Sequence, residues 1–273
     1  MSNLYLVATP IGNLEDLTFR ALRVLEEVSL IAAEDTRTSQ ILLKHYQIET
    51  PLTPYHDHNK ETKTAVLLKH LDQHDDLALI SDAGTPAIND PGFLLVQAAL
   101  REGHQVIPIP GPSAPVAALS GSGLPTDKFV YLGYLPRKST SRLELLNQIK
   151  DLPWTLICLE TPHRLLKSLE DCQSVLGNRE ISIARELTKL HEEFIRGPIS
   201  LAREHFQENQ PRGEITLVIA GSDPEGTWPE IRLLEELKRE LDNGELSPSQ
   251  LAKNLAVRSG WPRKAIYDLM QDL

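Results

Sequence analysis

Residues 81–92, which read S-D-A-G-T-P-A-I-N-D-P-G, have the composition of a loop that binds a ligand. Two glycines and two prolines among these twelve positions fix the backbone and leave little side-chain bulk, so a ligand could lie against main-chain N–H and C=O groups. Asp82 could meet a positive centre or ribose hydroxyls, or it could only cap the loop through nearby backbone N–H groups. The alternative for the whole segment is a tight connection without a ligand.

Two further loops share this composition. Residues 9–13 read T-P-I-G-N and residues 110–114 read P-G-P-S-A, and each follows a short apolar run. If those runs are parallel strands, all three loops open at the carboxyl edge of one sheet and can line one cleft. The loops match neither the dinucleotide nor the triphosphate glycine motif, and they contain no lysine or arginine. A nearly neutral or cationic ligand with an adenosine-like body fits them best.

His56 and His58 form a second motif, separated only by Asp57. Alternate residues of an extended segment point the same way, so the two imidazoles could share a metal ion. No third and fourth ligand stands at a characteristic spacing. We therefore interpret the two histidines as substrate contacts or as a polar loop face, and we expect no metal.

The elements that must position these residues alternate between strand and helix. Apolar runs predict strands at residues 4–8, 30–33, 77–80, 106–109, 129–133, 155–160, 181–185 and 215–220. Helical stripes predict helices at residues 17–28 with Asp16 as N-cap, 41–46, 65–71, 93–100, 115–120 and 164–176. Repeated strand–helix units with apolar strands indicate an α/β fold.

Segments rich in glycine and proline divide the chain. Residues 121–125 break the alternating pattern, and residues 221–229 are rich in Gly, Pro and Asp. We therefore expect an α/β domain over residues 1–120, a second α/β domain over residues 121–222, and a linker with a small helical tail over residues 223–273.

Two regions could contact nucleic acid. Arg137 and Lys138 lie in a basic loop just after Tyr131 and Tyr134, where they could bind phosphates, although the loop could equally be the solvated start of a helix. The tail has the pattern of a helix-turn-helix, but acidic residues are plentiful nearby and favour a packing or dimerisation module. The tail cations that could reach phosphates are Lys253, Arg258, Arg263 and Lys264.

Composition limits the class of protein. Of 273 residues, 41% are hydrophobic and 24% are charged, which is ordinary for a globular chain. Cys158 and Cys172 have no metal or redox spacing, and the N-terminus has no signal-like pattern, so we expect a reduced, cytoplasmic protein. No apolar run reaches the ~20 residues that span a bilayer. The net charge of −10 argues against non-specific coating of nucleic acid, without excluding a local basic patch.

Together the three loops resemble those of the tetrapyrrole methylase superfamily, and within it the chain is similar to the small-subunit ribosomal RNA 2′-O-ribose methyltransferase I family. The resemblance extends from about residue 4 to about residue 221. The chain departs from the family pattern at Asn89, Lys60 and Thr161, and Lys60 reverses a charge. Further matching segments are residues 33–37, 55–59, 122–127, 160–164, 184–189, 191–193 and 196–197.

The resemblance implies S-adenosylmethionine as methyl donor, bound in a cleft between the two α/β domains. It implies methylation of the ribose of a cytidine in the decoding region of 16S ribosomal RNA, with the 30S particle as the expected substrate. A homodimer is usual in the superfamily. The residues that would line the donor site are Pro10, Asp82, Gly84, Thr85, Ile88, Ser113 and Ala114, with Leu159 from the second domain.

Methylation of a hydroxyl needs a group that accepts its proton or polarises its oxygen. In one interpretation Lys189, with a lowered pKa, accepts the proton while Glu186 orients it; in the other the two form an ordinary i, i+3 ion pair. Asp35 and His163 are the other catalytic candidates. The resemblance and the side-chain chemistry give these substrate-binding candidates: Arg37, His56, His58, Asn59, Arg137, Lys138, Arg164 and Arg185.

Two other functions stay open at this point. The same scaffold could methylate tetrapyrrole intermediates of the precorrin type. A helix-turn-helix regulator could instead bind a nucleotide-like ligand without turnover. Basic motifs outside the three loops favour RNA over a tetrapyrrole, and the number of polar motifs directed to one cleft exceeds what a sensor needs.

Overall fold

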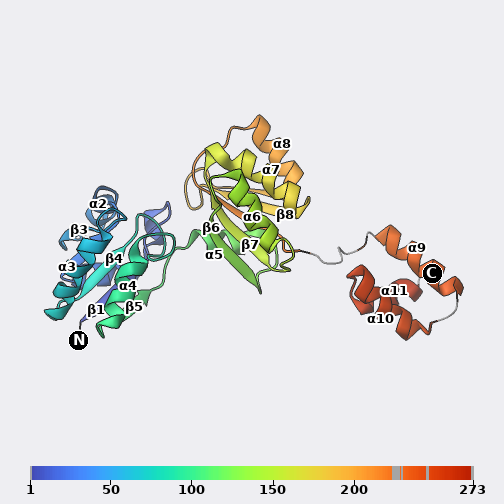
Figure 1. Cartoon of the computed structure of the whole chain (residues 1–273), viewed down its shortest axis with the longest axis horizontal. Helices are drawn as coiled ribbons and strands as arrows, with labels where there is room; N and C mark the ends of the chain where they lie inside the picture. Colours follow the sequence, from blue (N-terminus) through green and yellow to red (C-terminus); the bar gives the residue numbers. More distant parts are fainter. Residues whose placement is uncertain (1, 223–227, 229, 244–245, 272–273) are drawn as a thin grey trace.

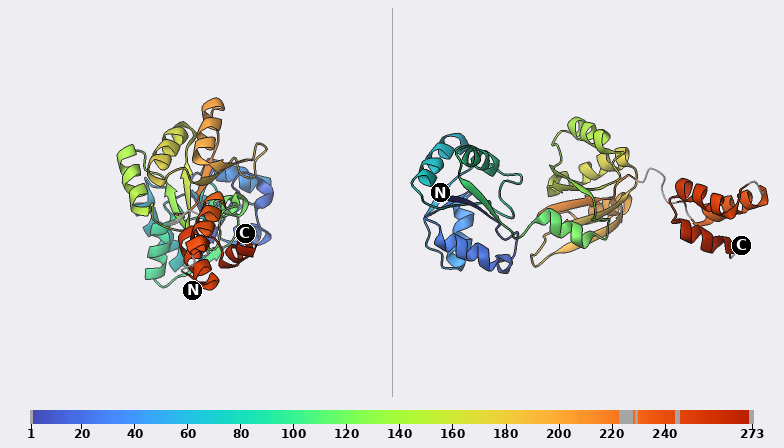
Figure 2. Two further views of the ribbon diagram at one scale, coloured as in Figure 1. Left: turned by 90° about the vertical axis from the view of Figure 1, so that its right-hand side faces the viewer. Right: turned by 90° about the horizontal axis from the view of Figure 1, so that it is seen from below.

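The computed structural model describes residues 2–271 except 223–227, 229 and 244–245. Three bodies follow one another along the chain: two sheets with their helices, and a helical tail (Figures 1 and 2). The α/β class expected from the sequence is confirmed. Within the described residues, no helix has the length and apolarity needed to cross a membrane.

The first sheet is entirely parallel, with strand order β3-β2-β4-β1-β5. Its faces are covered by α1 and α2 on one side and by α3 and α4 on the other, which buries apolar residues on both. The strands are β1 (Asn3–Val7), β2 (Leu30–Ala33), β3 (Leu52–Pro54), β4 (Leu77–Ile80) and β5 (Gln105–Ile109). The helices are η1 (Leu14–Asp16), α1 (Phe19–Glu27), α2 (Thr36–His45), α3 (Lys60–Asp72) and α4 (Gly92–Arg101).

The expected N-cap of the first helix is wrong. Asp16 ends the short 3₁₀ helix η1, and the Thr18 side chain caps α1 by accepting the Ala21 N–H at 3.1 Å. Strand β3 was not predicted, because its three residues Leu52–Pro54 are too short for a periodic pattern.

The second sheet is mixed, with strand order β6-β7-β10-β8-β9. β6 and β7 are parallel, whereas β10 runs antiparallel to both of its neighbours. The strands are β6 (Phe129–Tyr134), β7 (Thr155–Glu160), β8 (Glu180–Arg185), β9 (Glu193–Pro198) and β10 (Ile215–Ile219). α6 (Ser139–Ile149), α7 (Leu165–Leu176) and α8 (Ile199–Glu208) lie on its first face, and α5 (Ala114–Ser122) lies on the other. The short η2 (Pro162–Arg164) follows β7.

The packing of α5 shifts the expected domain division. Ala118 and Leu119 pack against Ile157, Ala184 and Val218 of the second sheet. A division at 120/121 would cut through α5 and separate most of it from the sheet that it covers. The division that the packing supports lies before α5.

The tail contains α9 (Glu230–Asn243), α10 (Pro248–Ser259) and α11 (Arg263–Gln271), which surround a small core of their own. Ser247 and Gln250 form a capping box at the start of α10, and Gly260, with φ of +69°, ends that helix. Much of the expected linker, residues 223–227 and 229, lies outside the described residues.

Candidate active site

The three loops of the first sheet form one connected edge, as predicted. Thr9 and Gly84 exchange backbone hydrogen bonds of 2.9 and 3.0 Å, which joins the loops after β1 and β4. The Thr85 hydroxyl donates to the Pro112 carbonyl at 3.3 Å, which joins the loops after β4 and β5. Gly84 has φ of +80°, a conformation that favours glycine. The edge is therefore built largely from main chain.

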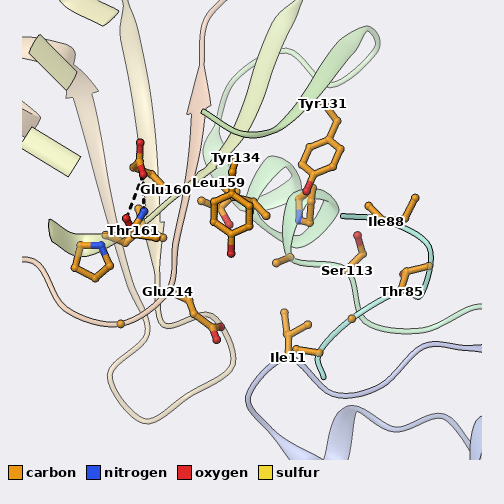
Figure 3. Close-up of a pocket in the computed structure, with 18 residues that line it drawn as sticks. Ile11, Thr85, Ile88, Ser113, Tyr131, Tyr134, Leu159, Glu160, Thr161 and Glu214 are labelled. Atoms are coloured by element: carbon orange, nitrogen blue, oxygen red, sulfur yellow. Dashed lines mark hydrogen bonds between the residues drawn. The ribbon is translucent and has the colours of Figure 1, made fainter. Parts of the chain in front are cut away.

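A central cavity of about 330 Å³ lies between this edge and the second sheet (Figure 3). Tyr131, Tyr134, Leu159 and the segment around Glu214 form its wall on the side of the second sheet. Among its lining residues, all of which the structure describes, there is no Lys, Arg or His. Burial raises the pKa of Tyr131 to about 12, so its phenol stays neutral. The expected donor residues that line this cavity are Gly84, Thr85, Ile88, Ser113, Ala114 and Leu159.

A second, lateral cavity of about 240 Å³ opens beside the central one and is bordered by α2. Pro10 and Asp82 line this lateral cavity, not the central cavity in which we expected them. For Asp82 the reason is a hydrogen bond: its Oδ1 accepts the Asp35 N–H at 2.9 Å, which directs the side chain toward β2 and away from β5. Lys189 also lines the lateral cavity.

Three residues line both cavities: Ile11, Ala83 and Glu214. Of these, only Glu214 carries a titratable group, and its side chain is 71% exposed. The Lys189 Nζ lies 3.4 Å from its Oε2. The boundary between the two cavities therefore holds a carboxylate with an ammonium group beside it.

Lys189 is also held by Glu186. The Glu186 Oε1 accepts hydrogen bonds of 3.0 Å from the Lys189 Nζ and from the Glu214 N–H. These bonds, with the backbone bond first, lower the pKa of Glu186. Gly213 makes the arrangement possible, because a Cβ there would lie 2.1 Å from that oxygen.

Of the two interpretations of Lys189, the structure favours the ion pair with Glu186 over a lysine of lowered pKa. Burial by itself lowers the pKa of Lys189, but the Glu186 and Glu214 carboxylates outweigh it and raise the value overall. The charged form of Lys189 is therefore favoured, and its ammonium group donates the hydrogen bond to Glu186.

The two halves approach closely at Gly12. A Cβ on Gly12 would lie 2.9 Å from the Leu187 carbonyl oxygen and 2.5 Å from the Lys189 Cγ. The neighbouring Ile11 packs with Leu187 and Ala184 of the second half. The loop after β1 thus positions the segment that carries Lys189.

Three carboxyl groups near the ends of β2 and β4 have raised pKa values. Burial is the largest cause of the raised pKa of Glu34, Asp82 and Asp90, and nearby carboxylates add to it. Such an edge is short of positive charge, and a cationic ligand would relieve the repulsion.

Asp35 and Arg37 form their own pair beside α2. The Asp35 carboxylate caps α2 through the Arg37 N–H at 2.9 Å and pairs with the Arg37 guanidinium at 2.7 Å. Hydrogen bonds from the Arg37 side chain and backbone lower the pKa of Asp35 to about 2. Asp35 lines neither cavity, and the Arg37 side chain is 89% exposed.

The histidine motif lies in the turn after β3. Asn59 stabilises the turn by accepting the His56 N–H at 2.8 Å, and the His56 and His58 ring centroids are 6.0 Å apart. Neither histidine belongs to a group of three metal-ligand side chains in the described part of the chain. The one such group there is Asp72, Glu102 and His104, whose ligand atoms all lie within 4.8 Å of one another.

Two arginines expected to bind substrate are engaged in ion pairs. The Arg164 guanidinium pairs with buried Glu160 at 2.5 Å and donates to the Leu135 carbonyl at 2.9 Å. Arg185 pairs with Glu193 at 2.8 Å. Arg164 therefore stabilises the second sheet, and Arg185 would have to leave Glu193 to reach a phosphate.

Glu214 and Tyr134 also line the central cavity, although neither was among the site residues predicted from the sequence. Ile215, the first residue of β10, pairs with Glu160 at the end of β7, so β10 begins at the edge where β7 ends. Only the strand direction reveals this placement of Glu214. The signal for Tyr134 was present, because it directly precedes the basic loop.

Residues 3–202 match the family model of the Tetrapyrrole (Corrin/Porphyrin) Methylases. The chain therefore belongs to this family. Over 100% of this chain and 99% of the relative it is 49% identical to "Ribosomal RNA small subunit methyltransferase I" of Synechocystis sp.. It is 50% identical to the protein of the same name from Escherichia coli O157:H7, over 80% of this chain and 77% of that protein.

Solved structures show the same fold at low sequence identity. Diphthine synthase gives a TM-score of 0.65 at 12% identity, over 80% of this chain and 90% of that one. Uroporphyrin-III C-methyl transferase from Thermus thermophilus complexed with S-adenyl homocysteine gives 0.57 at 21% identity, over 80% and 97%. At these identities the likeness concerns the fold alone.

Proposed function

We propose that this protein transfers a methyl group from S-adenosylmethionine to small-subunit ribosomal RNA, at the 2′-oxygen of a cytidine ribose in the decoding region. The names of the full-length relatives support the RNA substrate and the methyl transfer. The observation that carries the chemistry is the Glu214 carboxylate at the boundary of two cavities, with the Lys189 ammonium beside it.

The central cavity fits the donor. Apolar walls from Ile88, Tyr131 and Leu159 suit an adenine, while the main chain of the loops and the Thr85 and Ser113 hydroxyls can bond its polar edges. The lack of cations among the lining residues suits a ligand with a positive sulfonium centre. The donor supplies an electrophilic methyl group and leaves as a neutral thioether, so no acid is needed.

The lateral cavity would take the acceptor ribose. There the Glu214 carboxylate accepts the proton of the 2′-hydroxyl while the new O–C bond forms and the C–S bond breaks. The Lys189 ammonium group stabilises the charge that develops on the oxygen. Glu186 holds Lys189 in place through the 3.0 Å bond. Asp35, which lines neither cavity, and His163, which lies beside the central one, have no part in this proton transfer.

RNA contacts would extend from the acceptor cavity across the exposed cations of both halves. Arg37 offers an 89% exposed guanidinium beside α2. His56, His58 and Asn59 lie in the turn after β3 at the same edge of the first sheet. We expect the assembled 30S particle in the cytoplasm as substrate, because exposed groups spread over such an edge suit a structured surface.

We also propose a homodimer. Two large apolar side chains, Phe19 and Leu190, are 94% and 92% exposed. Surface of this kind favours burial against another chain. Sedimentation of the purified protein tests this: a monomer mass at micromolar concentration would contradict it.

The test of the proposed function uses donor with a labelled methyl group and three acceptors: 30S subunits, free 16S RNA and a precorrin-type tetrapyrrole. RNA products are digested to nucleosides. We expect the label in 2′-O-methylcytidine. Label on a base, transfer only to the tetrapyrrole, or no transfer to RNA in any assembly state would contradict the proposal.

A further inference from the structure

A third cavity of about 640 Å³ adjoins the central one at the ends of β6 and β7. Tyr134 and Thr161 line both of these cavities, so the two lie side by side with these residues between them. Arg137 and His163 also line the third cavity, which we call the flanking cavity. The proposed transfer reaction uses no group in it.

The loop that forms one wall of the flanking cavity, residues 135–138, is held from beneath by two arginines. Arg164 donates to the Leu135 carbonyl and Arg142 donates to the Pro136 carbonyl, each at 2.9 Å. Each guanidinium is neutralised by an acid: Arg164 by Glu160, and Arg142, only 3% exposed, by Asp171 at 2.5 Å. The loop backbone is therefore fixed by groups that are already paired.

Two further cations project from this fixed loop. Arg137 and Lys138 are both exposed, and no other side chain or backbone group in the described part of the chain forms an ion pair or hydrogen bond with either side chain. Beside them the Tyr134 side chain is 55% exposed, although it lies in a cavity wall. An exposed aromatic ring with unpaired cations next to it is the combination that binds an unstacked nucleotide: the ring stacks on the base and the cations meet the phosphate.

Tyr134 also lies close to the reacting groups. Tyr134 and Glu214 both line the central cavity. Burial is the largest cause of the raised pKa of Tyr134, and the Glu214 and Glu160 carboxylates add to it. In Figure 3 the Tyr134 hydroxyl is directed to the side of the cavity on which Glu214 lies. One side of Tyr134 thus borders the region of methyl transfer and the other borders the flanking cavity.

We propose that the flanking cavity binds the nucleotide next to the acceptor in the RNA chain, with its base on the Tyr134 ring and its phosphate at Arg137 and Lys138. This inference rests on the proposed function, because it names a subsite for the same RNA. The adjoining nucleotide must be unstacked to enter, so the acceptor is reached in a single-stranded or opened segment. The ring, and not the Tyr134 hydroxyl, makes the main contact.

The test compares Tyr134→Ala, Tyr134→Phe and the double variant Arg137→Gln/Lys138→Gln in methyl transfer to 30S subunits. We expect Tyr134→Ala to raise the KM for the RNA substrate about 5- to 150-fold, the range of one base–aromatic stack, and Tyr134→Phe, which keeps the ring, to retain the RNA KM of the wild type. The double variant should weaken binding and flatten its dependence on salt. Arg101→Gln, an exposed arginine at the far end of α4, is the matched control.

The donor Kd, measured by calorimetry on every variant, separates the outcomes. An unchanged RNA KM in Tyr134→Ala would overturn the subsite, and so would an equal loss in Tyr134→Phe. A donor Kd that rises by the same factor as the KM would assign the flanking cavity to the donor instead. If the wild type transfers nothing to RNA, the proposed function fails first, and that result is visible before any variant is measured.

Discussion

The first sheet contributes mainly main-chain groups to the site, whereas the second contributes charged side chains. The first sheet is parallel, so the ends of β1, β4 and β5 meet at one edge, which consists of interlocked loops with little side-chain bulk. In the second sheet the antiparallel β10 brings the segment before it to the ends of β7 and β8, and this edge carries the paired charges of Glu186, Lys189 and Glu214. A backbone-built edge suits a fixed donor, and a charged edge suits activation of an acceptor.

This division of labour predicts that variants of the two edges affect different steps. Glu214→Gln should have the largest effect, because it keeps the shape of the side chain and removes the proton acceptor. We expect the single-turnover rate at saturating donor to fall about 10²–10⁴-fold, the usual contribution of a general base, with the donor Kd unchanged. Glu144→Gln, an exposed glutamate on α6, is the control. A rate like that of the wild type would place the proton acceptor elsewhere.

The contact between the halves is the next target. Gly12→Ala should cost about 1–3 kcal/mol in the free energy of unfolding, because the new Cβ would lie 2.9 Å from the Leu187 carbonyl oxygen. Transfer should slow while donor binding persists. Gly111→Ala crowds Ala8 at the same distance of 2.9 Å but within the first half, and it should weaken donor binding instead. Urea unfolding and donor titration of both variants check this. If the two variants change the free energy of unfolding and the donor Kd equally, the edges of the two sheets do not have the different roles that we assign to them.

The donor edge is tested by filling the central cavity. Ala114→Leu adds volume where α5 begins, and we expect the donor Kd to rise about tenfold, equivalent to about 1.4 kcal/mol. RNA affinity should stay the same. Val116→Leu, at a 55% exposed position of the same helix, should leave both constants unchanged. Loss of RNA affinity in Ala114→Leu would show that the RNA, and not only the donor, occupies the central cavity.

The smallest effect concerns Asp82 and pH. Because burial raises the pKa of Asp82 in the folded state, the unfolded chain loses this proton first as the pH rises above 3.8. As the pH rises from 3.8 through the raised pKa, the free energy of unfolding of the wild type therefore falls relative to that of Asp82→Asn. This difference between the two proteins persists at pH 7. We expect a difference of about 0.5 kcal/mol or less. Thermal unfolding of both proteins at pH 3.5 and pH 7 measures it; a gap that widens toward acid would contradict the raised pKa.

Much of the first sheet could be predicted from the sequence, and less of the second. The strands before residues 9, 81 and 110 are apolar and end in Gly/Pro loops, so local patterns predict both the strands and their common edge. β9 escaped prediction because Glu193–Pro198 mixes charged, apolar and turn residues and forms a hairpin with β8. Local patterns contain no information on strand direction in a mixed sheet, and this direction places Glu214 in the site.

The charged residues at the edge of the second sheet show a further limit of prediction from the sequence. The i, i+3 spacing of Glu186 and Lys189 predicts that they can meet, and they do, at 3.0 Å. Spacing does not reveal Glu214, which lies 3.4 Å from the same ammonium group and adds to the rise in the pKa of Lys189. A residue 25 positions along the chain thus helps decide whether the lysine is a base or a cation.

The most direct test of the division between the two cavities is a crystal structure with S-adenosylhomocysteine bound. We predict that the adenosine lies in the central cavity, in contact with Thr85, Ser113 and Ala114, and that the sulfur faces Glu214 at the boundary. The lateral cavity beside Lys189 should remain open for the acceptor. A ligand that occupies the lateral cavity, against Asp82 and Lys189, would contradict the assignment of donor and acceptor.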